Sequence, residues 1–405
     1  MDLRLARRAV TVAYVGQGVC FAALVSRVPA VQSKFELSDG ALGLIVGLVP
    51  IIAGVGSVVA GSLAETHGSR PVLRVLGPVV PLALVAAGFA PSVGLLLVAL
   101  IVLGFGLGSV DATMNIQGVR VQDDLGRPVV ASFYAAFSLA GFVGALLASA
   151  AAGTAMSLGV FFALIAVVLI PVQLVAGRFL LPGHPVPPPL QEASAEGQAP
   201  RIHWRPVMLV GIALMCVYIA DSAASTFSAD YLHKASPEGL GSTESVAALA
   251  FAAYSLMTVA GRIMVDRTVG RVGAVRLVRV GGFTAVAAAA AVAIAPSPAV
   301  AIAAFALLGL AICQAIPLAF TAAASHDKTS SGVAVARVNV FNYAGFVIGA
   351  PLMGTISSGT GSLRWAYAAL IPVLLVVPLL ATWFRIAPHD APDTGDHVVG
   401  DALTT

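Results

Sequence analysis

Two carboxylates lie deep inside apolar stretches of this sequence, where ionised side chains are costly. Asp111 belongs to the segment LGFGLGSVDATMNIQG and Asp221 to the segment CVYIADSAASTFSADYL. Acids at membrane depth usually line an interior cavity, and an apolar environment disfavours the charged form of a carboxyl group. We therefore predict that Asp111 takes up a proton from one side of a membrane and releases it to the other, with Asp221 assisting. The alternative is that both are structural acids packed between helices.

Other polar side chains recur at helical spacing inside similar apolar stretches. Asp111 and Asn115 lie four residues apart and share one helix face, which is too polar for contact with lipid. The candidates for contact with a bound solute are Tyr14, Gln17, Tyr218, Ser225, Gln314, Asn339, Asn342 and Tyr343. Hydroxyl, amide and aromatic groups around a cavity suit a small polar solute such as a sugar, a polyol or an amino compound. For each residue, the alternative is a hydrogen bond that merely joins neighbouring helices.

The sequence shows no pattern typical of an enzyme or of a cofactor site. We find no cluster of nucleophile and base, no His-rich metal pattern and no phosphate-binding loop of the G-x-x-x-x-G-K-S/T kind. Cys20, Cys216 and Cys313 each lie in an apolar run, which indicates packing and not disulfides. The net charge of +3 gives no indication of nucleic-acid binding. We expect a protein without catalytic residues, cofactors or metals.

The elements that hold these residues are predicted to be membrane-spanning helices. Of the 405 residues, 59% are hydrophobic and 10% are charged, which is far below the charged fraction of a soluble domain. Apolar stretches long enough to cross the bilayer recur along the chain. The twelve expected spans are 9–30, 40–63, 71–90, 93–118, 129–152, 157–180, 207–231, 243–265, 273–295, 298–323, 331–356 and 364–386. The fold class is therefore an all-α membrane protein.

Positive charges predict the orientation, because loops rich in Lys and Arg stay in the cytoplasm. With the N-terminus inside, all but four of the 22 Lys and Arg residues fall on the cytoplasmic side; the exceptions are Arg27, Lys34, Lys234 and Arg364. We expect a multi-pass protein of the inner or plasma membrane with both termini in the cytoplasm. The start MDLRLARRAV reads as part of an uncleaved anchor.

A proline-rich segment divides the spans into two groups of six. Residues 181–206 lack apolar periodicity and are predicted to be a solvated cytoplasmic linker. The predicted organisation is a six-helix bundle at 1–180, the linker, a second six-helix bundle at 207–386 and a cytoplasmic tail at 387–405. The string AGFV occurs in both groups, at 140–143 and 344–347, which supports an internal repeat. Paired halves are typical of a transporter that rocks one half against the other.

Two related strings follow the second span of each half: GSLAETHGSRP at 61–71 and GRIMVDRTVGR at 261–271. The first string resembles the loop signature of the major facilitator superfamily, G-x-L-a-D/E-r-x-G-r-R. The resemblance extends over all twelve spans and implies two pseudo-symmetric six-helix bundles and a cytoplasmic gate latched by the loop carboxylate. The predicted gate residues are Gly61, Glu65, Gly68, Arg70, Arg120, Asp266, Arg267, Arg271 and Arg337.

Electrostatics is compatible with such a gate. A carboxylate at a helix end can pair with an arginine and with the positive N-terminus of a facing helix, and these contacts form in only one state. Arg120 and Arg337 are the expected partners of Glu65. The alternative is that these are ordinary charges of cytoplasmic loops.

A narrower resemblance rests on the string DATMN, on GRP at 126–128 and on FSLAGFVGALL. These are similar to the fucose-permease-like branch of the superfamily, and more so to the MosC-type membrane proteins. The resemblance implies that Asp111 is the protonation site and that Asn115 contacts the substrate. The fucose-permease pattern also has an acid in the first span, where this chain has Tyr14 and Gln17, so fucose itself is not expected.

The leading interpretation is a secondary transporter that moves a small polar solute by alternating access, driven by protons. The competing interpretation is proton-driven export of drugs or amphiphilic metabolites, although the segment 140–153 lacks the G-x-x-x-G-P pattern of drug/proton antiporters. A sensor that binds without transport, or a membrane enzyme, would belong to another class. The expected partners are a small-molecule substrate, protons and the lipid bilayer, and we expect a monomer.

Overall fold

The computed structural model describes residues 2–154, 156–182, 201–236 and 238–386 and is helical throughout its regular elements. Twelve of its helical segments are long and apolar enough to cross a membrane. The first half holds α1 (Leu3–Ser26), α2 (Val28–Phe35), α3 (Asp39–His67), α4 (Ser69–Phe89), α5 (Val93–Leu125), α6 (Val130–Ala152), α7 (Leu158–Ala176) and η1 (Gly177–Phe179). The second holds α8 (Trp204–His233), α9 (Glu244–Val272), α10 (Ala274–Ala293), α11 (Pro298–Ile312), α12 (Ala315–Ser325), α13 (Val333–Thr360), α14 (Leu363–Leu380) and η2 (Ala381–Phe384).

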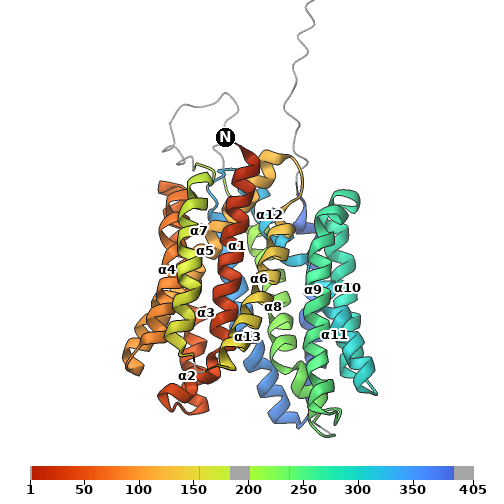
Figure 1. Ribbon diagram of the computed structural model, residues 1–405. Coiled ribbons are helices and arrows are strands. Elements are labelled where there is room, and N and C mark those ends of the chain that lie inside the picture. The colour runs from red at the N-terminus through yellow and green to blue at the C-terminus, as the bar shows by residue number, and fades with distance from the viewer. Residues whose placement is uncertain (1, 155, 183–200, 237, 387–405) are drawn as a thin grey trace, which may run out of the picture.

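The first six and the last six spans lie side by side (Figure 1). In that view α4 and α7 form one flank and α10 and α11 the other, with α1, α6, α8 and α13 near the middle. The sets meet mainly where α13 packs against α3 and α6 packs against α9, and α5 also touches α13 and α12, and α6 touches α12. The twelve helical spans predicted from the sequence are confirmed in the structure. We call these groups the first set and the last set.

Two local features differ from the expected spans. The short helix α2 follows directly after Arg27 and carries Pro29 in its first turn, where a missing amide proton does no harm. The tenth span is interrupted at Cys313 and Gln314, so that it consists of α11 and α12. Hydropathy alone cannot reveal either feature, since neither changes the apolar character of the segment.

Equivalent turns connect the second and third spans of each set. Gly68 between α3 and α4 has φ 83° and ψ 155°, and Gly273 between α9 and α10 has φ 80° and ψ 152°. A side chain would be strained at these positive φ values, so glycine permits both sharp turns. The two glycines are 205 positions apart, close to the 204 positions that separate the two AGFV strings, so the matching geometry supports the internal repeat.

The end of the molecule at which α1 begins is here called the predicted cytoplasmic end. The start of α8, the end of α12 and η2 meet there, because the backbone N–H of His203 donates to the His326 carbonyl and the His326 ring bonds the Trp383 carbonyl. The domain boundaries at 180, 206 and 386 stay predictions. Most of the predicted linker (183–200) and the whole predicted tail (387–405) lie outside the described residues.

Candidate functional site

The Asp111 side chain joins the two sets of helices. Its carboxylate accepts hydrogen bonds from the Tyr343 hydroxyl at 2.9 Å and from the Asn342 amide at 3.4 Å, both on α13. The side chain is 9% exposed. Within the described part of the chain, no Lys or Arg forms an ion pair with it. A buried acid whose bonded partners are neutral and come from the opposite set is well placed to bind a proton reversibly.

Asn115 ties three helices of the first set together one turn from Asp111. Its side-chain oxygen accepts from the hydroxyls of Tyr14 on α1, at 2.8 Å, and Tyr134 on α6, at 2.9 Å. Its amide nitrogen donates to the Asp111 carbonyl at 2.8 Å. The structure therefore brings together Tyr14, Asn115 and Asp111 as the sequence pattern suggested, and it adds Tyr134.

Asp221 is the centre of a second polar cluster, in the last set. Its carboxylate accepts a hydrogen bond from the Tyr254 hydroxyl on α9, and Arg262 is the cation that acts on it electrostatically. Tyr218, one turn away on α8, lies within electrostatic range of both Asp221 and Asp111. Ser225 is exposed and donates only to carbonyls of its own helix, including that of Asp221.

Arg262 connects the Asp221 cluster to the first set, a role that sequence reasoning did not assign to it. The residue is 8% exposed, and its guanidinium lies 5.7 Å from the centroid of the Tyr134 ring. One nitrogen donates to the Ser138 hydroxyl on α6, whereas Nε has no partner in the structure. The available signal was an arginine well inside a span, which is costly unless it has an interior role. Because Arg262 belongs to the string 261–271, the sequence alone suggests that it is part of a loop.

Asn339 and Asn342 extend the Asp111 network toward the predicted cytoplasmic end. The Asn342 amide donates to the Asn339 side-chain oxygen at 3.1 Å, and the Asn339 amide donates to the Ser57 hydroxyl on α3 at 3.2 Å. Ser57 in turn donates to the Ala336 carbonyl at 3.0 Å. These bonds hold α3 against α13, so in this state the Asn339 side chain stabilises the contact between the two helices.

Two predicted solute contacts lie apart from the Asp111 network. Gln17 donates to the Leu107 carbonyl at 3.1 Å, and its side-chain oxygen is buried without a partner. Gln314 lies against Gly281 of α10, within the last set, and its amide nitrogen has no partner. Both glutamines therefore lie against a helix of their own set, and each has one buried polar atom without a partner.

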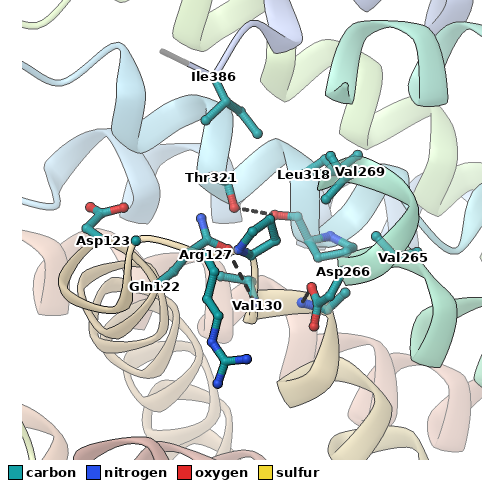
Figure 2. A pocket seen from close by; sticks show the side chains of 14 residues that line it. Gln122, Asp123, Arg127, Val130, Val265, Asp266, Val269, Leu318, Thr321 and Ile386 are labelled. Carbon is teal, nitrogen blue, oxygen red and sulfur yellow. Dashed lines mark hydrogen bonds between the residues drawn. The ribbon is translucent and has the colours of Figure 1, made fainter. Parts of the chain in front are cut away.

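The predicted gate residue Asp266 makes a contact between the sets at the predicted cytoplasmic end. Its two carboxylate oxygens accept from the backbone N–H groups of Ala131, at 3.1 Å, and Ser132, at 2.9 Å, in the first turn of α6. Figure 2 shows this carboxylate directed at the start of α6, beside a cleft of about 240 Å³ between α5, α6, α9 and α12. A carboxylate at this position satisfies free N–H groups and complements the helix dipole.

Glu65 has a different environment from Asp266. It is exposed in the last turn of α3, and no ion pair joins it to Arg120 or Arg337 in the described structure. Asp266 lies six residues before the end of α9, whereas Glu65 lies two residues before the end of α3. Asp266 is therefore further from the helix end and closer to the contact between the sets. The expected pairing of Glu65 with these arginines is absent from this state.

Among the remaining predicted gate residues, Arg120 and Gly61 contact the opposite set. Arg120 donates to the Ser330 carbonyl at 3.2 Å and so joins α5 to the loop before α13. Arg70 donates to the Arg178 carbonyl at 2.8 Å, within the first set. Arg267 and Arg271 are exposed, and Arg337 is partly buried. Gly61 allows close packing, because a Cβ there would overlap the Ala336 side chain of α13.

The hydrogen bonds between the two sets that are named above lie between the predicted cytoplasmic end and the level of Asp111. The sets are therefore closed against each other on that side. In the described ranges, no group of three or more His, Cys, Asp or Glu side chains is arranged to hold a metal ion.

Comparisons with known proteins agree with this architecture. The family model of the Major Facilitator Superfamily matches residues 10–326 and 210–399. An uncharacterized transporter, y4wD of Sinorhizobium fredii, is 28% identical over 376 residues, which are 91% of this chain and 97% of that protein. Membrane protein MosC of Rhizobium meliloti is 26% identical over 385 residues, 94% of this chain and 90% of its own length. The crystal structure of the transporter FucP in the outward conformation has a TM-score of 0.75 at 17% identity and covers 93% of this chain and 98% of that one.

Proposed function

We propose that this chain, which belongs to the Major Facilitator Superfamily and is a secondary transporter, uses a proton gradient to drive the transport of a small polar solute. The solute class is a sugar, a polyol or a related metabolite. Asp111 carries the proton, and Asp221 assists. The observation that carries the proposal is the pair of hydrogen bonds from Tyr343 and Asn342 to the Asp111 carboxylate, since these bonds join the two sets.

Protonation of Asp111 would act directly on the contact between the sets. An ionised carboxylate accepts strong hydrogen bonds, whereas the protonated group is a weaker acceptor and competes as a donor. Tyr343 and Asn342 would then lose part of their interaction with α5. These bonds would break when the two sets separate, so proton binding would have a different free energy in the two states, as coupling requires.

The solute class follows from the groups around Asp111. Tyr14, Asn115 and Tyr134 form one cluster of hydroxyl and amide groups, and Asn342 and Tyr343 face it from α13. Such groups pair well with sugar or polyol hydroxyls, and a site built to hydrogen-bond hydroxyls rejects analogues that lack them. A solute that replaces the Tyr343 hydroxyl at Asp111 would release the sets in the same way as a proton.

Alternating access then consists of breaking the contacts at the predicted cytoplasmic end. Asp266 would leave the start of α6, and the bonds of Ser57 and Arg262 to the opposite set would break. The proton gradient supplies about 2.3 kcal/mol per 100 mV and about 1.4 kcal/mol per pH unit, enough to accumulate a solute more than tenfold. We place both termini in the cytoplasm and the protein in the inner or plasma membrane, on the basis of the charge distribution.

A ligand screen followed by transport tests the proposal. Thermal unfolding of the purified protein is measured with sugars, polyols, amino acids and antibiotics, because a ligand of the folded state raises the unfolding temperature. The stabilising compounds are then offered to proteoliposomes with an imposed pH gradient. We expect a hydroxylated solute to stabilise the protein and to accumulate. Stabilisation only by amphiphilic drugs, with transport against the proton flux, would favour the exporter, and binding without transport would indicate a sensor.

A further inference from the structure

A groove at the predicted cytoplasmic end lies apart from the transport site. It has a volume of about 1150 Å³ and is formed by the end of α9, the α9–α10 turn, the first turns of α10, the end of α12 and the residues around η2, and Pro128 of the first set also lines it. Three arginines line it: Arg276 and Arg279 on α10 and Arg385 after η2. No Asp or Glu is among the residues that line it.

The three arginines are exposed and are not neutralised by neighbouring side chains. In the part of the chain that the structure describes, no ion pair or hydrogen bond engages their guanidinium groups. Arg276 and Arg279 also lie in the first two turns of α10, where the N-terminal end of the helix adds positive potential. Three like charges at such a position repel one another, and an anion bound between them would relieve the repulsion.

Exposed apolar side chains form one wall of the groove. Val280 is 58% exposed and Val272 is 39% exposed, and both line the groove. Phe283, one turn further along α10, is 51% exposed and continues the same apolar surface. Helix α10 lies at the flank of the molecule (Figure 1), so this surface belongs to the periphery of the last set.

We propose that this groove binds an anionic phospholipid, with the headgroup phosphate between Arg276, Arg279 and Arg385 and an acyl chain along Val272 and Val280. Basic pockets at the cytoplasmic membrane surface recognise lipid headgroups in this manner. Planar guanidinium groups donate two parallel hydrogen bonds to a phosphate, which suits arginine better than lysine. The apolar wall is the reason to assign a lipid and not a soluble anion. This site is independent of the proposed solute and of proton coupling.

Native mass spectrometry of the full-length protein, equilibrated with phosphatidylglycerol or phosphatidylcholine, tests the assignment. We expect the wild type to retain phosphatidylglycerol in preference to phosphatidylcholine. The double variant Arg276→Gln/Arg279→Gln should bind phosphatidylglycerol about 30-fold more weakly, because each basic residue contributes about fivefold. Arg178→Gln, which removes an exposed arginine at the same end of the first set, should bind like the wild type. Arg276→Lys/Arg279→Lys should recover part of the loss.

Equal retention of the two lipids by the wild type, or unchanged binding by the Gln/Gln variant, would overturn the assignment. Two further arms test other occupants. If inorganic phosphate stabilises the lipid-free protein as much as phosphatidylglycerol does, the site recognises a soluble anion. Residues 387–405 contain four Asp and no Lys or Arg and begin next to Ile386, which lines the groove. If only a variant without these residues binds phosphatidylglycerol, the acidic tail occupies the groove and the lipid proposal fails.

Discussion

Ser57 and Arg262 occupy equivalent places in the two sets of helices. Each lies eleven residues before the glycine that ends its helix, Gly68 or Gly273, and each donates a hydrogen bond to a helix of the opposite set. Ser57 bonds the Ala336 carbonyl of α13, and Arg262 bonds the Ser138 hydroxyl of α6. The repeat therefore places a donor at the α3–α13 contact and another at the α6–α9 contact, but only one of these two donors is charged.

Arg262→Gln is expected to weaken the contact between α9 and α6 and to shift the protein toward the state that is open at the predicted cytoplasmic end. The variant loses the cation–π contact with Tyr134 and the positive charge that acts on Asp221. Distances between spin labels on Asp124 and Gly270, both exposed at that end, should broaden to larger values. Arg262→Lys should not restore the wild-type distribution, since the compact ammonium lacks the fixed fork of donors from which Arg262 bonds Ser138. Full restoration by Lys would show that charge alone matters.

Asp111→Asn is expected to abolish accumulation driven by a pH gradient in proteoliposomes, because an amide cannot carry the proton. Counterflow exchange of the same solute should remain within about threefold of the wild type, since the amide preserves the shape and one acceptor of the carboxyl. Asp230→Asn, which changes an exposed acid near the other end of α8, is the matched control and should accumulate normally. Undiminished accumulation in Asp111→Asn would remove Asp111 from proton coupling.

Tyr343→Phe is expected to remove the 2.9 Å bond to Asp111 while it keeps the ring packing. A hydrogen bond to a charged group contributes about 1.5–3 kcal/mol. The effects of Tyr343→Phe and Asp111→Asn on the thermal stability of the resting state should therefore not add, and a double-mutant cycle measures this coupling. Additive effects would mean that the two side chains act independently.

Asp266→Ala should weaken the latch at the start of α6 and Glu65→Ala should not. Loss of a helix N-cap costs about 0.5–2 kcal/mol, which corresponds to a shift of about 2- to 30-fold in the balance between the two states. Glu65 has no ion-pair partner within the described residues, so its removal should change the balance less than twofold. The shift is measured as the rate of crosslinking between one cysteine at the start of α6 and one at the end of α9, both at the predicted cytoplasmic end. Equal effects of the two variants would contradict the asymmetry of the gate.

Gly61→Ala and Gly54→Ala form a matched pair on α3. A Cβ at Gly61 would overlap Ala336, whereas a Cβ at Gly54 meets no atom within 4 Å. Alanine raises helix propensity by about 1 kcal/mol at either site, so this gain cancels in the comparison. We expect Gly61→Ala alone to separate α3 from α13, detected between labels on Thr66 and Lys328. Identical label distances in both variants would show that the contact tolerates a methyl group.

Local sequence patterns predicted the helices and the faces that carry polar residues. The length and composition of an apolar stretch indicate a span without knowledge of its neighbours, because a backbone in lipid must satisfy its own hydrogen bonds. The four-residue spacing likewise places Asp111 and Asn115 on one face whatever the tertiary structure. The bond from Asn115 to the Asp111 carbonyl is the direct result of that spacing.

Contacts between distant helices could not be predicted in this way. Gln17 and Asn342 both carry a buried amide, yet Gln17 donates to a carbonyl of its own set and Asn342 donates to Asp111 of the opposite set. Glu65 matches the loop signature better than Asp266, yet only Asp266 reaches the opposite set. The periodicity of a sequence shows which face of a helix a side chain occupies, but not which neighbouring helix packs against that face.

The sequence by itself determined that this chain crosses a membrane in two groups of six helices and which side chains lie at membrane depth, since spacing and hydropathy are properties of a single segment. The tertiary structure alone decided that Asp111 meets Tyr343 across 232 positions of the chain and that Arg262 meets Ser138 across 124. Those pairings depend on how closely whole helices approach, which small residues such as Gly61 permit and which the packing of all twelve spans together determines.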